Sequence, residues 1–122
     1  MTEELTRFLE RYVGLWNETD AERRRKTIAE LWAPDGANYT QSTQAVGHEA
    51  IETRVTRAYD AYVGSGRYRF RSVEPQAEHH NAVKLEWEMV SVTSGEVASV
   101  GLEFLLLDDD GRIISDHQFI VR

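Results

Sequence analysis

Residues 95–122 read GEVASVGLEFLLLDDDGRIISDHQFIVR, and this stretch decides the fold. Across 96–107 nearly every position is apolar, so both faces of a strand there must be covered by other parts of the chain. The acidic run at 108–111 ends in glycine and is typical of a turn, after which 112–122 returns as a second strand. The sequence therefore predicts a long antiparallel hairpin over its last 28 residues.

Glu103 is the one charged residue inside the apolar part of the first of these strands. In an extended strand its face also carries Ser99, Gly101, Leu105 and Leu107, and the opposite face carries Ala98, Val100, Leu102, Phe104 and Leu106. Burying a bare carboxylate is strongly unfavourable. Glu103 is therefore expected to be paired, neutral or at the wall of a cavity, and to lie near the functional site.

The chain of 122 residues has the length of a single domain, 1–122, which can bury a substantial core. It contains no cysteine, so disulfides and thiolate metal sites do not arise. Its 14 Lys and Arg against 21 Asp and Glu give a net charge of −7, which disfavours nucleic acids and anionic membranes as partners. No apolar run is long enough to cross a membrane and the N-terminus does not resemble a signal peptide, so a cytoplasmic location is expected.

The spacing of apolar residues predicts three helices in the first half of the chain. Residues 3–17 repeat apolar side chains at three and four positions, as one face of a helix does. A second helix follows the N-cap candidate Asp20 and ends before Pro34, and a third spans about 49–63.

Strands fill the remainder. A short strand is expected at 37–41 and a loop at 41–45, before the third helix. Alternating side chains then predict a strand at 67–79, interrupted at Pro75, and another at 83–89 ahead of the C-terminal hairpin. This order predicts an α+β fold, with the three helices packed on the concave face of a curved antiparallel sheet.

Two local motifs support a family resemblance: GHEAI at 47–51 opens the third helix, and DGRI at 110–113 lies in the last hairpin. Together with the order of elements, they make the whole chain resemble the nuclear-transport-factor-2-like superfamily. That superfamily includes ketosteroid isomerase, SnoaL-like polyketide cyclases and non-catalytic binding domains. The resemblance implies a cone-shaped, cystatin-like α-β barrel with a pocket on the concave face and a homodimer contact on the convex face.

The resemblance to ketosteroid isomerase carries over residue by residue. Glu103 falls where that enzyme has the protonated aspartic acid of its oxyanion hole, and Tyr12 falls where it has the oxyanion-hole tyrosine. Thr40 falls at the general-base aspartate, and a threonine hydroxyl cannot accept the substrate proton at neutral pH. The catalytic aspartate position of the SnoaL-like cyclases is Gln118 here, with Asp116 two residues earlier.

Tyr12, Glu103 and Asp116 are accordingly the predicted catalytic residues. The inward face of the last strand is predicted to carry Ile114, Asp116, Gln118 and Ile120, with His117 facing the other way. Two simpler interpretations stay open: Tyr12 bonded to an ionised Glu103, and Asp116 as a solvated strand-end residue. The predicted ligand-binding residues are Trp16, Trp32, Asn38, Thr40, Arg54, Leu85, Trp87, Met89, Ser99 and Gln118.

An aromatic wall with few polar groups is typical of a pocket for a flat apolar ligand. The expected function is a cofactor-independent isomerase, cyclase or dehydratase acting on a hydrophobic carbonyl compound, steroid- or polyketide-like. The alternative is a non-catalytic ligand-binding or protein-interaction domain. No metal site is expected, because His79 and His80 face opposite sides of a strand and have no third ligand. The apolar face from Ala98 to Leu106 is predicted to be buried in a homodimer.

Overall fold

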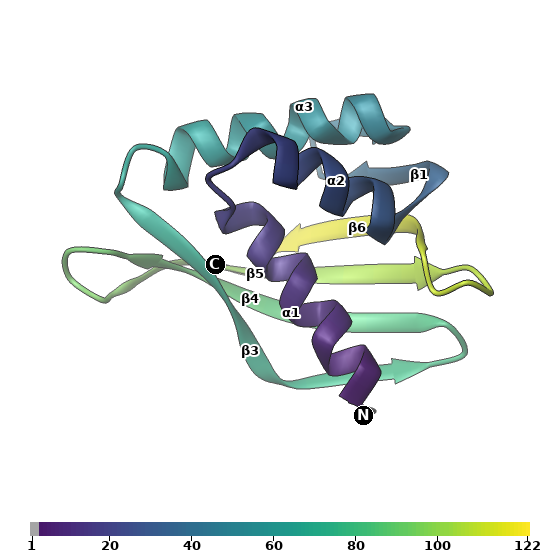
Figure 1. Ribbon diagram of the computed structural model, residues 1–122. Coiled ribbons are helices and arrows are strands. Elements are labelled where there is room, and N and C mark those ends of the chain that lie inside the picture. Colours follow the sequence, from purple (N-terminus) through teal and green to yellow (C-terminus); the bar gives the residue numbers. More distant parts are fainter. Residues whose placement is uncertain (1–2) are drawn as a thin grey trace.

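The computed structural model describes residues 3–122 and shows helices lying over one face of a curved six-stranded sheet (Figure 1). The elements run in the order α1 (Glu3–Asn17), α2 (Ala21–Leu31), β1 (Trp32–Tyr39), β2 (Gln44–Val46), α3 (His48–Ala58), the π-helix η1 (Tyr59–Val63), β3 (Tyr68–His79), β4 (Ala82–Ser91), β5 (Val97–Leu107) and β6 (Ile113–Ile120). This arrangement confirms the predicted α+β class.

The sheet is mixed, whereas a purely antiparallel sheet was predicted. Its strand order is β2-β1-β6-β5-β4-β3, and β3 to β6 form the expected antiparallel meander. β1 pairs with β6 in parallel. These two strands lie far apart in the sequence, so no tight turn between them imposes an antiparallel pairing. β2 occupies part of the segment that was predicted as a loop.

Three predicted boundaries differ in the structure. β1 already begins at Trp32 and not at residue 37, and its pairing with β6 is irregular between Trp32 and Ala37. β3 is continuous, and its predicted interruption near Pro75 is instead a shift in register. The third helix changes from α to π geometry after Ala58. In the first two cases the pairing shifts its register without ending the strand.

Side-chain hydrogen bonds hold the helices to their neighbours. Asp20 caps α2 as predicted, because its Oδ1 accepts from the backbone N–H of Glu22 at 2.9 Å. At the start of α3, His48 Nε2 lies 2.9 Å from the carbonyl oxygen of Trp32 and 3.1 Å from that of Ala33. This contact ties α3 to β1, which sets the distance between the helix and the sheet. None of the described helices combines the length and the hydropathy needed to cross a bilayer.

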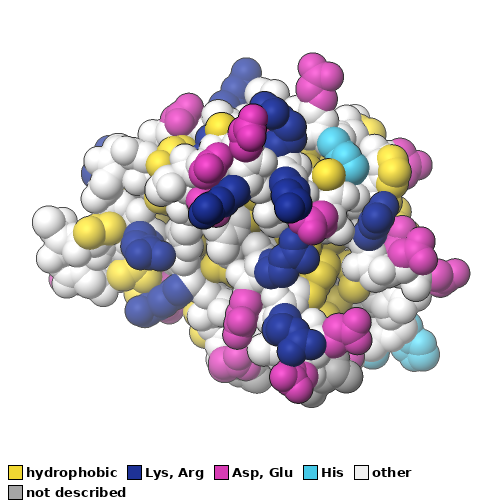
Figure 2. Space-filling view, in the orientation of Figure 1, with side chains coloured by type: hydrophobic (Ala, Val, Ile, Leu, Met, Phe, Trp, Pro, Cys, Tyr) yellow, Lys and Arg dark blue, Asp and Glu magenta, His cyan; other side chains and the backbone are white. Residues whose placement is uncertain are grey.

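Charged side chains of both signs are mixed over the helical side of the molecule (Figure 2). On α2, Arg25 is exposed and pairs with Glu52 of α3 at 3.0 Å. The neighbouring Arg24 behaves differently. It is buried, with its guanidinium 4.4 Å from the ring centre of Tyr59, because a long side chain can bury its stem and stack its planar head on an aromatic ring.

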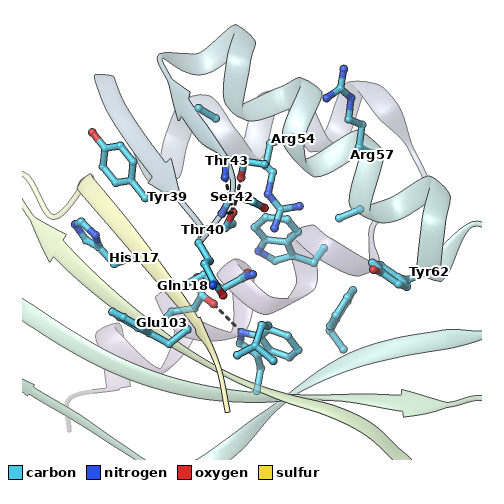
Figure 3. A pocket seen from close by; sticks show the side chains of 18 of the residues that line it. Tyr39, Thr40, Ser42, Thr43, Arg54, Arg57, Tyr62, Glu103, His117 and Gln118 are labelled. Atoms are coloured by element: carbon cyan, nitrogen blue, oxygen red, sulfur yellow. Dashed lines mark hydrogen bonds between the residues drawn. The ribbon is translucent and has the colours of Figure 1, made fainter. Parts of the chain in front are cut away.

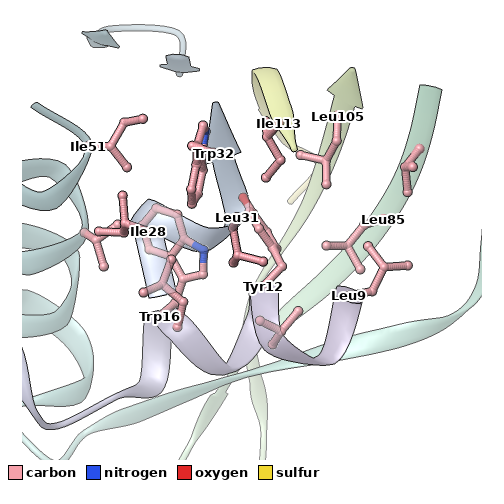
Figure 4. Close-up of a cluster of buried hydrophobic side chains, with 14 of the residues drawn as sticks. Leu9, Tyr12, Trp16, Ile28, Leu31, Trp32, Ile51, Leu85, Leu105 and Ile113 are labelled. Carbon is pink, nitrogen blue, oxygen red and sulfur yellow. The ribbon is translucent and has the colours of Figure 1, made fainter. Parts of the chain in front are cut away.

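The hydrophobic core fills one end of the concave face, between the sheet and the helices (Figure 4). Its fully or almost fully buried side chains include Leu9, Leu15, Ile28, Leu31, Ile51, Val55, Val83, Leu105 and Ile113. Trp32 and Leu85 also belong to this core, with no exposed surface, although both were predicted to line the pocket. They lie at the end of the sheet that the helices cover completely.

Candidate functional site

A cavity of about 1070 Å³ lies at the other end of the concave face (Figure 3). It is lined by α1, α3, η1, the segment 39–45 and strands β3 to β6. One part of its wall is aromatic or apolar and includes Trp16, Tyr62, Phe70, Trp87 and Met89. A space of this size accommodates a small organic molecule of several rings.

The structure brings most of the predicted site residues to this cavity. Its lining includes Tyr12, Trp16, Thr40, Arg54, Trp87, Met89, Ser99, Glu103 and Gln118. Asn38 and Asp116 are fully buried behind that wall and do not line the cavity, and Trp32 and Leu85 belong to the core. Within residues 3–122, no three His, Cys, Asp or Glu side chains are grouped so that they could hold a metal ion.

The Tyr12 hydroxyl joins the two predicted catalytic carboxyls. It lies 3.0 Å from Glu103 Oε1 and also hydrogen-bonds Asp116 Oδ2. A tyrosine hydroxyl has one proton, so it can donate to only one of the two and must accept from the other. Because an ionised carboxylate cannot donate, at least one of the two carboxyl groups carries a proton.

Two further donors complete this network. Trp87 Nε1 donates to Glu103 Oε2 at 2.7 Å, and Asn38 Nδ2 donates to Asp116 Oδ2 at 2.9 Å. Asp116 Oδ1 and Asn38 Oδ1 are buried without a hydrogen-bond partner among the described residues. The acidic pair is therefore held by Tyr12, Trp87 and Asn38, and only Glu103 of its two carboxyls reaches the cavity.

Burial sets the protonation states in this network. Burial, and then the neighbouring Asp116, raise the pKa of Glu103 well above the ordinary glutamate value. Burial also raises the pKa of Asp116, but hydrogen bonds from Glu103, Tyr12 and Asn38 and the charge of Arg54 oppose that rise. The pKa of Tyr12 is raised well above its usual value by burial and by both carboxyls. Of the two carboxyls, Glu103 therefore holds its proton more strongly, and Asp116 is the one that ionises more readily.

Gly101 explains how Trp87 reaches Glu103. The two residues are cross-strand partners on β4 and β5, and a Cβ added at Gly101 would collide with the indole ring of Trp87. Without a side chain at this position, the ring lies flat on the sheet and its Nε1–H points at the carboxyl group. A glycine in the middle of a strand often marks such a close approach, so this signal was present in the sequence.

The face of β6 was predicted with one error near its start. Ile114 was expected to point inward but is 48% exposed, whereas Ile113 is fully buried. The pairing of β5 with β6 shifts in register between Leu106 and Leu107, so the inward and outward positions change there. Beyond the shift, Asp116 and Gln118 point inward as predicted. His117 packs against Tyr39, with ring centres 5.1 Å apart, at the rim of the cavity.

Sequence reasoning missed several aromatic side chains of the cavity wall, among them Tyr62 and Phe70. Tyr62 comes from the π-helix η1 and meets Phe70 of β3 edge-on, with ring centres 6.4 Å apart. Phe70 in turn meets Trp87 edge-on at 5.4 Å. The register of β3 on β4, which pairs Phe70 with Met89, would have placed Phe70 on the concave face. Nothing in the sequence indicated the change to π geometry that positions Tyr62.

Solved structures show the same fold. A protein of the SnoaL-like family from Agrobacterium tumefaciens, provisionally assigned as an isomerase, superposes with a TM-score of 0.89. It is 28% identical in sequence, and the match covers 100% of both chains. A provisionally assigned polyketide cyclase from Sinorhizobium meliloti has a TM-score of 0.70 and 16% identity over 92% of this chain and 93% of its own.

A protein from Catenulispora acidiphila with a ketosteroid-isomerase-like fold was solved in complex with trimethylamine. It has a TM-score of 0.69 and 16% identity, over 98% of this chain and 86% of its own. No protein-family profile matches the sequence, and no curated protein matches it. The structural matches therefore identify the fold, and the chemistry has to be argued from the site.

Proposed function

We propose that this chain, which has the nuclear-transport-factor-2-like fold of SnoaL-like and ketosteroid-isomerase-like proteins, catalyses a proton transfer within a hydrophobic carbonyl compound. The reaction class is an isomerisation or a cyclisation, in which a carbon beside a carbonyl group loses a proton. Glu103 is the group that exchanges the proton with the ligand. Tyr12 and Asp116 lie behind Glu103, and Asp116 holds the proton when Glu103 is ionised.

One observation carries this proposal: a single tyrosine hydroxyl bridges two buried carboxyls, and one of them lines a cavity. The hydroxyl can pass a proton from Glu103 to Asp116 by accepting from one and donating to the other. The network therefore has two arrangements of one proton, with the charge on Asp116 or on Glu103. A buried pair of acids whose pKa values differ is the usual arrangement for acid and base catalysis.

The proposed reaction starts from the arrangement in which Asp116 holds the proton and Glu103 is charged. The Glu103 carboxylate takes a proton from the carbon beside the ligand carbonyl, and the electrons of the C–H bond move into the enolate. Glu103 then returns the proton to another atom of the ligand, so an isomerisation needs no co-reactant. Because burial raises the pKa of Glu103, its charged form is a stronger base than an exposed glutamate.

Gln118 is the proposed donor to the enolate oxygen. It is the cross-strand partner of Glu103 on β6 and it lines the cavity. Its amide N–H₂ can donate to an oxygen on which negative charge develops. Gln118 occupies the position of the catalytic aspartate of SnoaL-like cyclases. In this proposal it acts as a hydrogen-bond donor and not as a base.

The experiment is hydrogen exchange at carbon. Wild-type protein and Glu103→Gln are incubated with 2-tetralone in D₂O, and loss of the signal from the protons beside the carbonyl is followed by NMR. General base catalysis typically contributes a factor of about 10² to 10⁴, so the variant is expected to lose at least about 100-fold of the catalysed exchange. Glu96→Gln is the control, because it makes the same chemical change at an exposed position outside the cavity, and it should keep the activity.

A binding role without catalysis is the second candidate, and one observation favours it. The Thr40 hydroxyl, at the position expected for a general base, lies 2.6 Å from the Thr43 hydroxyl and accepts from the Thr43 backbone N–H at 3.0 Å. It is engaged in a local turn and not in acid–base chemistry. Tight binding of several aromatic ketones, with exchange rates equal to those of Glu103→Gln, would favour this candidate over the enzyme.

A further inference from the structure

Arg54 is a cationic side chain in the cavity, and no acidic side chain in the described chain forms an ion pair with it. It projects from α3 on the side of the helix that faces the cavity, and Figure 3 shows its guanidinium pointing inward. The guanidinium carbon lies 5.2 Å from the ring centre of Trp16. This stacking fixes the plane of the guanidinium but supplies no hydrogen-bond acceptor.

No residue in the described chain offers Arg54 a hydrogen bond or an ion pair, and its Nε is buried with no partner. Two other arginines on the helical side are paired, Arg25 with Glu52 and Arg11 with Glu30. A buried N–H without an acceptor is unfavourable, and such groups in native structures call for an explanation. Nε itself is out of a ligand's reach, but the two Nη groups are not buried, and an anion bound to them would stabilise the whole guanidinium.

The acidic network does not neutralise Arg54. Glu103 is the one carboxyl among the described residues that line the cavity, and its neutral form is favoured. The charge of Arg54 lowers the pKa of Asp116, but it does so less than the hydrogen bonds from Glu103, Tyr12 and Asn38. Asp116 is fully buried behind the wall and accepts no hydrogen bond from Arg54. The positive charge therefore faces the open space of the cavity.

We propose that Arg54 is the binding site for a carboxylate group on the ligand, so that the natural ligand is an aromatic or alicyclic carboxylic acid. The terminal edge formed by the two Nη groups carries two N–H donors side by side, which match the two oxygens of a carboxylate. The apolar wall of Trp16, Phe70 and Trp87 then holds the ring system. Combined with the proposed function, on which this assignment partly rests, the substrate class is a hydrophobic keto acid.

The test uses two probes of the same shape, 2-naphthoate and the neutral ketone 2-acetylnaphthalene, and measures dissociation constants by quenching of tryptophan emission. Wild-type protein is expected to bind the carboxylate more tightly than the ketone. Arg54→Met keeps an unbranched apolar stem and removes the charge. Since a hydrogen bond to a charged group contributes roughly 1.5–3 kcal/mol, the variant should bind naphthoate about 10- to 100-fold more weakly. Its affinity for the ketone should change no more than about twofold, within the scatter of such a contact.

Arg23→Met is the control for the loss of one positive charge, because Arg23 is exposed on α2 and does not line the cavity, and naphthoate affinity should stay within about twofold. Arg54→Lys keeps the charge but loses the paired donors, so its affinity should be intermediate even if Arg54→Met folds poorly. Equal losses for both probes in Arg54→Met, or no preference of the wild type for the carboxylate, would overturn the assignment. Glu103→Gln separates the two proposals, because it should abolish proton exchange and still bind naphthoate.

Discussion

The two ends of the concave face differ although the same strands build both. On β4, Leu85 is fully buried in the core, whereas Trp87 and Met89 on the same face line the cavity. On β5, Leu105 lies in the core and Glu103, two residues earlier, reaches the cavity. We call these the packed end and the hollow end.

The acidic network lies where the two ends meet. Behind it, core side chains such as Trp32 exclude water, which raises the pKa values of Glu103 and Asp116. In front of it, the hollow end allows a ligand to reach Glu103. A carboxyl group deep in the core would have no substrate, and one in open solvent would have an ordinary pKa. The boundary position supplies both conditions for acid–base chemistry.

The largest expected effect comes from comparing one side-chain truncation at the packed end with one at the hollow end. Leu85→Ala removes a fully buried side chain and should lower the free energy of unfolding by about 2–5 kcal/mol. Met89→Ala, on the same strand and face, removes a side chain that borders empty space and should cost less than about 1.5 kcal/mol. Urea denaturation measures both. Similar losses for the two variants would mean that the hollow end is packed in solution.

The next effect concerns the boundary between the ends. Gly101→Ala forces the Trp87 ring away from β5 and breaks its hydrogen bond to Glu103, so we expect a loss of about 1–3 kcal/mol. Gly14→Ala is the matched control, since nothing lies near an added Cβ at this exposed helix position, and it should stabilise by about 0.5–1 kcal/mol. Thermal unfolding with tryptophan emission as the readout separates the two. An unchanged emission spectrum in Gly101→Ala would contradict the proposed packing.

A smaller effect, the pH dependence of the unfolding free energy, tests whether Glu103 is neutral. Its folded pKa is raised, so its contribution to stability is fully present below the unfolded pKa, near 4.5, and is lost as the pH rises through the folded pKa. The unfolding free energy of wild type minus that of Glu103→Gln should therefore fall between these two pKa values, by at most about 1.4 kcal/mol per pH unit. Glu96→Gln, at an exposed position, controls for the loss of one charge. A difference that increases steadily with pH would show instead an ionised Glu103.

The smallest expected effect on the cavity comes from the opposite face of the sheet. Phe104 and Leu106 are both 43% exposed there, and we propose that a second copy of the chain covers them. The neighbouring Lys84 and Glu86 on β4 carry opposite charges, so a twofold contact would let each pair with its counterpart.

Sedimentation should therefore give twice the mass of one 14.0 kDa chain at micromolar concentration. Phe104→Glu should give the single-chain mass and leave naphthoate affinity unchanged, because its side chain faces away from the cavity. A wild-type protein that sediments as one chain would refute the dimer. A Phe104→Glu variant that weakens ligand binding would show that the two faces are coupled.

Side-chain periodicity explains how much of the site was predictable. Strict alternation along β5 placed Glu103 on the concave face, and the resemblance to ketosteroid isomerase placed Tyr12 opposite it. Alternation failed at Ile114, because a register shift between strands is set by the pairing and not by either strand alone. It also could not distinguish Leu85 from Trp87, which share a face and differ only in what the helices place above them.

The sequence by itself determined the α+β order, the C-terminal hairpin and the presence of a carboxyl group among apolar neighbours, because these follow from local periodicity and composition. Only the tertiary structure decided which apolar residues became core and which became cavity wall, and that Asp116 lies out of reach behind Glu103. It also decided that Arg54 has no hydrogen-bond or ion-pair partner in the described chain. These properties depend on distances between α1, α3 and the sheet, and such distances arise from packing between segments up to 104 residues apart, which no local pattern encodes.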